Sequence, residues 1–141
     1  DMIFENQLYS SNYHLLFPIK KNIVGRIQKK SREIEFYHYA NIFVSRLLKT
    51  KQTESACVLL TSNPHIFIFL YSKIKTSFTQ FLKAIDDLDI SFFTLNGLYA
   101  NGINPKRAKL YYSGLADKNE GYVQILNKYM HSVSILSDAK I

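Results

Sequence analysis

The chain has 141 residues, of which 47% are hydrophobic, so it is long enough for one domain with a buried core and too apolar for a disordered segment. Its single cysteine, Cys57, excludes an internal disulfide framework and a thiolate metal cluster. The net charge of +7 lies in one segment, because residues 20–51 contain nine basic and two acidic residues and the rest of the chain sums to zero. Such a concentration of charge favours a polyanionic partner over a solvated basic face.

In chain order, the apolar residues alternate between the period of strands and the period of helices. Strands are expected over 2–5, 33–39, 65–71 and 89–102. Helices are expected over 10–30 (beginning or kinked at Pro18), 40–51, 75–88, 104–115 and 117–136, with a short helix or turn over 53–62. This alternation predicts an α/β fold, with a single α/β sandwich domain over residues 1–141 and a roughly four-stranded sheet flanked by helices.

The most hydrophobic stretch, LLTSNPHIFIFLYSK over residues 59–73, predicts a turn followed by a strand that is covered on both faces. We expect this strand, residues 65–71, to be the central strand of the sheet. Its apolar run is too short to cross a membrane, so no membrane partner is expected. The first residues, DMIFENQ, lack the charged and apolar regions of a signal peptide.

Few residues have the spacing that catalysis or metal binding requires. The four histidines show no metal-ligand spacing, and NGLYANG (96–102) has the glycines of a phosphate loop without its Gly-Lys-Ser/Thr ending. Asp86, Asp87 and Asp89 resemble a Mg²⁺ site, but a solvated turn at the end of a helix is the favoured interpretation. Cys57 is expected to be a small core residue. We therefore expect no catalytic residue, no metal site, no cofactor and no enzyme activity.

Four segments, taken in order along the chain, resemble motifs of a known family. They are IEFYHYANIFVSRLL (34–48), LLTSNPHIFIF (59–69), FTQFLKAIDDLDISFFTLNGLYANG (78–102) and LADKNEGYVQIL (115–126). In this order they resemble the tenth large-subunit ribosomal protein, the stalk-base family whose archaeal and eukaryotic members are called P-zero. Asn41 and Arg46 stand at the Asn and the second Arg of the family's strand–helix motif, whereas Ala40 and Ser45 replace its Lys and its first Arg.

The resemblance implies a divergent structural constituent of the mitochondrial large ribosomal subunit. The chain would bind large-subunit rRNA at the base of the lateral stalk, beside the eleventh large-subunit ribosomal protein, and would support the recruitment of translation factors. Acidic stalk protein dimers would bind a C-terminal helix that is mostly absent from these residues. The implied location is the mitochondrial matrix, on the ribosome, with a nucleolar or cytoplasmic location as the alternative.

The basic segment and the resemblance together define the expected RNA-binding surface. Cations would neutralise rRNA phosphates, Tyr37 and Tyr39 would stack on bases, and the resemblance adds hydrogen bonds from Asn41 and Arg46. The expected RNA-binding residues are Lys20, Lys21, Arg26, Lys29, Lys30, Arg32, Asn41, Arg46, Lys49 and Lys51. Three alternatives remain open: a nucleolar ribosome-assembly paralogue of P-zero, a non-ribosomal interaction module, and a small enzyme that uses the three aspartates.

Overall fold

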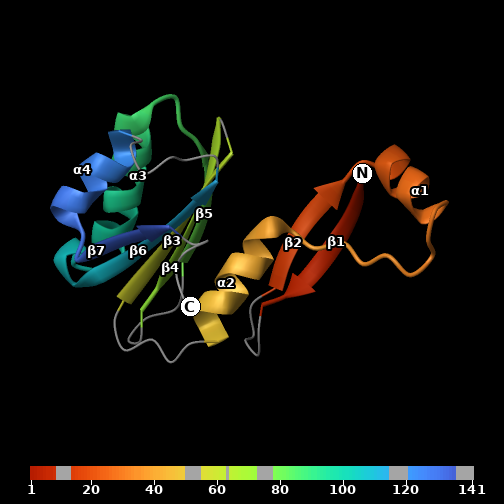
Figure 1. Ribbon diagram of the computed structural model, residues 1–141, viewed down its shortest axis with the longest axis horizontal. Coiled ribbons are helices and arrows are strands. Elements are labelled where there is room, and N and C mark those ends of the chain that lie inside the picture. Colours follow the sequence, from red (N-terminus) through yellow and green to blue (C-terminus); the bar gives the residue numbers. More distant parts are fainter. Residues whose placement is uncertain (9–13, 50–54, 63, 73–77, 115–120, 136–141) are drawn as a thin grey trace. The chain divides into compact units, whose positions relative to one another are not determined.

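The computed structural model describes residues 1–8, 14–49, 55–62, 64–72, 78–114 and 121–135. Its internal contacts form two compact units, which are described separately: unit 1, Asp1–Lys49, and unit 2, Thr50–Ile141 (Figure 1). The expectation of one domain over residues 1–141 stays a prediction.

Unit 1 is built on an antiparallel hairpin, followed by two helices. Its elements are β1 (Met2–Gln7), β2 (His14–Ile19), α1 (Lys21–Gln28) and α2 (Tyr39–Lys49). Phe4 and Phe17 face each other across the hairpin, with ring centroids 5.9 Å apart. The prediction that residues 14–19 belong to a helix is wrong, because they form β2. Along this stretch exposed and more buried residues alternate, with Leu16 and Pro18 outward and Phe17 inward, which is the period of a strand.

Unit 2 contains a five-stranded mixed sheet with two α-helices. Its strands are β3 (Ser55–Ser62), β4 (His65–Tyr71), β5 (Phe78–Lys83), β6 (Ala108–Gly114) and β7 (Ser132–Ile135). The first three form an antiparallel meander, and β6 and β7 continue parallel to β3, in the order β5-β4-β3-β6-β7. The central strand is therefore β3, and the expectation that residues 65–71 occupy the centre is wrong.

The main core of unit 2 lies between one face of the sheet and two helices, α3 (Asp87–Ala100) and α4 (Gly121–Tyr129) (Figure 1). Fully buried members of this core are Cys57, Leu59, Ile68, Leu98, Leu110 and Leu126. The opposite face of β3 and β4 is also buried and apolar, through Val58, Leu60, Phe67 and Phe69. Burial on both faces explains why these two strands read as continuous apolar runs.

The end of α3 is closed by a glycine cap. Gly102 has a φ of 69°, and its N–H donates to the carbonyl of Tyr99 at 3.0 Å, while the N–H of Ile103 donates to that of Leu98 at 2.9 Å. This pair of hydrogen bonds is the Schellman arrangement, which needs a residue that tolerates the left-handed region. Asn101-Gly102 therefore ends a helix, whereas the sequence reading assigned it to a turn after a strand.

The α/β class is confirmed, with five strands in the main sheet. Several individual elements are wrong: 33–39 forms no strand, 53–62 contains β3, 78–83 is β5, 87–100 is α3, and 108–114 is β6. Asn104 does cap a helix, since its side chain accepts the N–H of Lys106 at 3.0 Å. That helix is one 3-10 turn, η1 (Pro105–Arg107), because Ala108, Leu110 and Tyr112 then alternate inward as a strand.

Candidate functional site

Six of the nine cations of residues 20–51 lie in helix α1 or in the residues directly before and after it. The backbone of Lys20 is extended and α1 begins at Lys21; within the helix only Val24 is buried. The helix ends where the N–H groups of Lys29 and Ser31 donate to the carbonyls of Gly25 and Ile27, at 3.2 and 3.3 Å. The chain then turns through residues 29–33, all of which are exposed.

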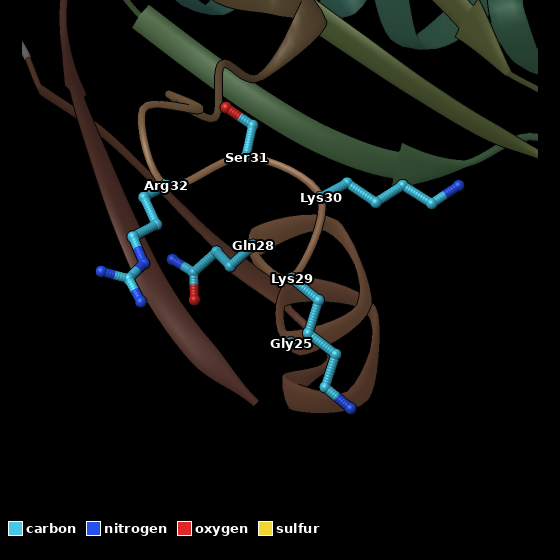
Figure 2. A pocket seen from close by; sticks show the side chains of 6 residues that line it. All are labelled: Gly25, Gln28, Lys29, Lys30, Ser31 and Arg32. Carbon is cyan, nitrogen blue, oxygen red and sulfur yellow. The ribbon is translucent and has the colours of Figure 1, made fainter.

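A hollow of about 740 Å³, largely open to solvent, lies at this helix end (Figure 2). We call it the basic turn; its lining residues are Gly25, Gln28, Lys29, Lys30, Ser31 and Arg32. Apart from its chain neighbours and the backbone of its own helix, nothing lies within 4 Å of a Cβ atom added at Gly25, so there is open space beside this glycine. Three cations and no carboxylate line it, which makes the hollow attractive to anions.

The cations of the basic turn point in different directions. Figure 2 shows the amide of Gln28 beside the guanidinium of Arg32, whereas Lys29 and Lys30 extend away from this pair and from each other. Within the described part of the chain, none of these three cations takes part in an ion pair. Divergent cations suit separate anionic groups along an extended partner better than one small enclosed anion.

The remaining expected RNA-binding residues do not converge on the basic turn. Lys20, Lys21 and Arg26 are exposed along α1, while Arg46 and Lys49 are exposed in the last turn of α2. Cations at the end of a helix also interact favourably with the helix dipole. Lys51 lies outside the described residues. Three of the ten expected residues therefore lie together in one hollow.

Asn41 has a structural role in unit 1 that its sequence position did not predict. It is buried, its Nδ2 donates to the carbonyl of Gln7 at 3.3 Å, and its Oδ1 accepts the hydroxyl of Ser45 at 3.3 Å. The bond to Gln7 attaches α2 to the end of β1, while the bond from Ser45 lies within α2. The amide expected to bind RNA is therefore engaged inside unit 1.

Asn6 holds the segment before α2 against the hairpin. Its Nδ2 donates to the carbonyl of Phe36 at 3.0 Å, and its Oδ1 accepts the N–H of His38 at 2.9 Å. The ring of Phe36 also lies 4.8 Å from that of Phe4. This buried asparagine bonds both a backbone carbonyl and a backbone N–H of the segment 33–38, which forms no strand. Nothing in the local sequence around Asn6 indicates this role.

His38 caps α2. Its Nδ1 accepts the N–H of Ala40 at 3.2 Å, which requires an unprotonated Nδ1, and its ring lies 4.6 Å from that of Tyr39. Burial lowers the pKa of His38 below its ordinary value of 6.5. The neutral imidazole is therefore the form that fits the folded chain.

We expect the stability of unit 1 to fall on acidification. Because the pKa of His38 is lowered by folding, its contribution is fully present above about pH 6.5 and is lost as the pH falls towards the folded-state pKa. The loss should stay below about 1 kcal/mol because the ring is only partly buried. Thermal unfolding of His38→Asn should show a weaker pH dependence, since asparagine caps a helix without titrating. Equal pH dependence in both proteins would contradict the role of His38, because the other histidines are common to both.

The three aspartates form the start of α3. The Oδ1 of Asp86 accepts the N–H of Asp89, and the Oδ2 of Asp89 accepts the N–H of Ile85, both at 2.9 Å. Reciprocal bonds of this kind satisfy the free N–H groups at a helix start. A Cβ atom at Gly121 would collide with the carboxylate of Asp87, which therefore lies against the first residue of α4. The carboxylates that resembled a Mg²⁺ site serve to begin one helix and to pack against another.

Other candidates for chemistry also have structural roles. Cys57 is buried in β3, and desolvation raises the pKa of its thiol, which makes the thiol a poor nucleophile. Gly97 is buried within α3 and Gly102 ends that helix, so neither belongs to a loop around a phosphate. In the described ranges, no three residues of the types His, Cys, Asp and Glu are placed to hold a metal ion.

The fold of the chain is similar to that of a solved structure. A crystal structure from Bacteroides thetaiotaomicron VPI-5482, titled as a protein with an actin-like ATPase fold and unknown function, matches the chain with a TM-score of 0.81 and 17% identity. The match covers 99% of this chain and 55% of that one, so the chain spans about half the length of the solved structure. The chain thus resembles half of an actin-like ATPase fold.

The family model described as "Protein of unknown function (DUF3822)" matches residues 1–133. The chain therefore belongs to the DUF3822 family. No curated protein matches the chain in sequence.

This membership overturns the resemblance to the ribosomal stalk-base family. The inferred role in the large ribosomal subunit is wrong, and so are the inferred partners: large-subunit rRNA, the eleventh large-subunit protein and acidic stalk dimers. The structural reason is that the matched motifs lie on different elements. The strand expected at the start of IEFYHYANIFVSRLL is absent, FTQFLK is strand β5 instead of the expected helix, and LNGLYANG ends a helix instead of the expected strand.

No helix in the ranges that the structure describes is long and apolar enough to cross a membrane.

Proposed function

We propose that this chain is a non-ribosomal interaction module that performs no catalysis and binds an extended anionic partner through the basic turn. The observation that carries this proposal is the hollow lined by Lys29, Lys30 and Arg32, with no carboxylate among its lining residues. Gln28 and Ser31 add hydrogen-bonding groups beside these charges. Partners with several separated anionic groups gain affinity from each cation as counterions are released.

The proposal that the module is not an enzyme is supported by the candidate metal-binding and nucleophilic side chains, which have structural roles instead. Asp86 and Asp89 are engaged in capping α3, and Cys57 is buried with a raised pKa. The actin-like ATPase fold of the similar crystal structure is a property of that longer protein, and fold alone does not carry activity to this chain.

The expected mitochondrial location depended on the ribosomal resemblance. Membership of the DUF3822 family removes that support, so the location is not part of the proposed function.

The proposal is tested by titrating the protein with long-chain inorganic polyphosphate, a polyanion without base or peptide chemistry, by isothermal titration calorimetry at several salt concentrations. Affinity should fall steeply with salt. The double variant Lys29→Glu/Arg32→Glu should bind at least about tenfold more weakly, with a salt slope shallower by about 1 to 2, because two neutralising cations are lost.

A matched control separates the basic turn from net charge. Lys83→Glu/Lys128→Glu changes the total charge by the same amount at two exposed positions of unit 2. It should lower affinity much less than the double variant in the basic turn. Equal losses in both variants would refute the assignment of the site, and absence of polyphosphate binding by the unaltered protein would refute the function.

A further inference from the structure

Helix α3 has an apolar outer face, which we call the α3 stripe: Ile85, just before the helix, and Leu88, Phe92 and Tyr99 within it. These residues are 93%, 69%, 62% and 63% exposed. Together with the partly buried Leu95, they follow the alternating spacing of three and four residues that helices use to pack on one another. The stripe belongs to unit 2, whereas the basic turn belongs to unit 1.

The α3 stripe is not the ordinary outer face of a surface helix. The inner face of α3 packs into the core through Ile90, Phe93 and Leu98, so an amphipathic helix would carry charged residues outside. Instead, residues 90–100 contain no charged side chain. The exposed side chains make a continuous patch on the order of 500 Å², whereas isolated exposed apolar residues are normal and need no partner.

We propose that the α3 stripe binds a second copy of this chain, through antiparallel pairing of the two α3 helices about a two-fold axis at Phe92. In this register the two Phe92 side chains meet, Ile85 lies opposite Tyr99 of the second copy, and Leu88 lies opposite the segment 95–96. Each residue of the stripe thus lies opposite, or close to, another residue of the same stripe in the second copy. An interface between two identical surfaces requires this symmetry.

Charge at the two ends of α3 favours the antiparallel direction. The start of the helix carries Asp86, Asp87 and Asp89, while Lys106 and Arg107 lie in η1, which follows the helix end and contacts it. Antiparallel pairing places the acidic end of each copy near the basic end of the other and also opposes the two helix dipoles. A parallel pair would bring like charges together.

The size of the patch sets the strength of the dimer. Two stripes bury on the order of 1,000 Å² in total, which is at the lower limit for a specific interface. The dimer should therefore be weak, dissociating over the micromolar range rather than persisting at nanomolar concentration.

Sedimentation equilibrium of the whole chain from about 5 to about 500 µM tests the dimer. The unaltered protein should shift from monomer to dimer, and Phe92→Glu should remain monomeric because two carboxylates would meet at the axis. Tyr129→Glu, at an exposed aromatic residue of α4, is the matched control and should dimerise like the unaltered protein. Circular dichroism checks that each variant is folded. If the unaltered protein stays monomeric over the whole concentration range, the proposal is overturned. The stripe would then be covered by a different protein or by another segment of the chain.

The register has its own test. Phe92→Cys should form an intermolecular disulfide under mild oxidation, because the two introduced thiols lie at the axis. Cys57 can stay in place, since it is fully buried. Asn127→Cys, on the exposed face of α4, is the control. Cross-linking of Phe92→Cys no faster than of Asn127→Cys would overturn the antiparallel pairing.

Discussion

Replacing Leu59 with alanine is expected to lower the free energy of unfolding by about 3 to 5 kcal/mol, because the substitution leaves a cavity in the most enclosed strand of the molecule. Leu59 is fully buried in β3, opposite Ile68 of β4 and Tyr112 of β6. Its side chain therefore lies in the middle of the core that joins the sheet to α3 and α4. Urea denaturation followed by circular dichroism measures the loss.

Leu16→Ala is the matched control for this substitution. Leu16 is 63% exposed on β2, so the same truncation should cost less than about 1 kcal/mol. A similar loss for both leucines would mean that residues 55–62 do not form the centre of the sheet.

Replacing Asn6 with alanine is expected to destabilise unit 1 by about 2 to 3 kcal/mol. The substitution leaves the carbonyl of Phe36 and the N–H of His38 without the side-chain partner that now bonds both of them. The segment before α2 should loosen from β1 as a result. Hydrogen exchange of the His38 amide, measured by nuclear magnetic resonance, should accelerate by at least about tenfold.

Asn22→Ala provides the comparison. Asn22 is exposed in α1, where alanine has the higher helix propensity, so stability should stay equal or rise slightly. Unchanged exchange at His38 in the Asn6→Ala variant would show that the hairpin does not depend on this asparagine.

The fold class could be predicted because helical and strand patterns do alternate along the chain. Two predictions are confirmed within the described residues: residues 40–49 lie in α2, which has a regular apolar stripe, and residues 65–71 form β4, which has the short apolar run of a doubly covered strand. These elements have one strong local pattern each. Where the local sequence pattern fits both helix and strand, pairing with a strand elsewhere in the chain determines which of the two forms.

Strand β5 and helix α3 show how this ambiguity arises. Phe78, Phe81 and Leu82 match helical spacing, yet they pair with β4 as an antiparallel strand. Helix α3 contains phenylalanine, isoleucine and threonine, which favour strands, and it is apolar on both its inner and outer faces. Because apolar residues lie on both faces, this helix lacks the contrast between one apolar and one polar face by which a surface helix is usually recognised. The spacing of Asp86 and Asp89, three residues apart, is the sequence signal for its start, because an acidic residue at each of these positions can form reciprocal capping bonds.

The candidate site divides along the same line. Lys29, Lys30 and Arg32 are neighbours in sequence, so their proximity at the end of α1 could be predicted without the fold. The burial of Asn41 could not, because its partner Gln7 is distant in sequence. The ribosomal resemblance failed for a related reason: short motifs matched in order, but the elements that carry them differ.

The order of strands in unit 2 has a consequence for its synthesis. As the chain emerges, β3 can pair with β4 at once, but its other edge waits for β6, since Ser55 pairs with Ala108. Until then, the central strand of the sheet has an open edge and two uncovered faces, and exposed edges of this kind allow chains to pair with one another wrongly. Conditions that slow translation before residue 114 should therefore lower the yield of soluble protein, while the compact folded state remains unaffected.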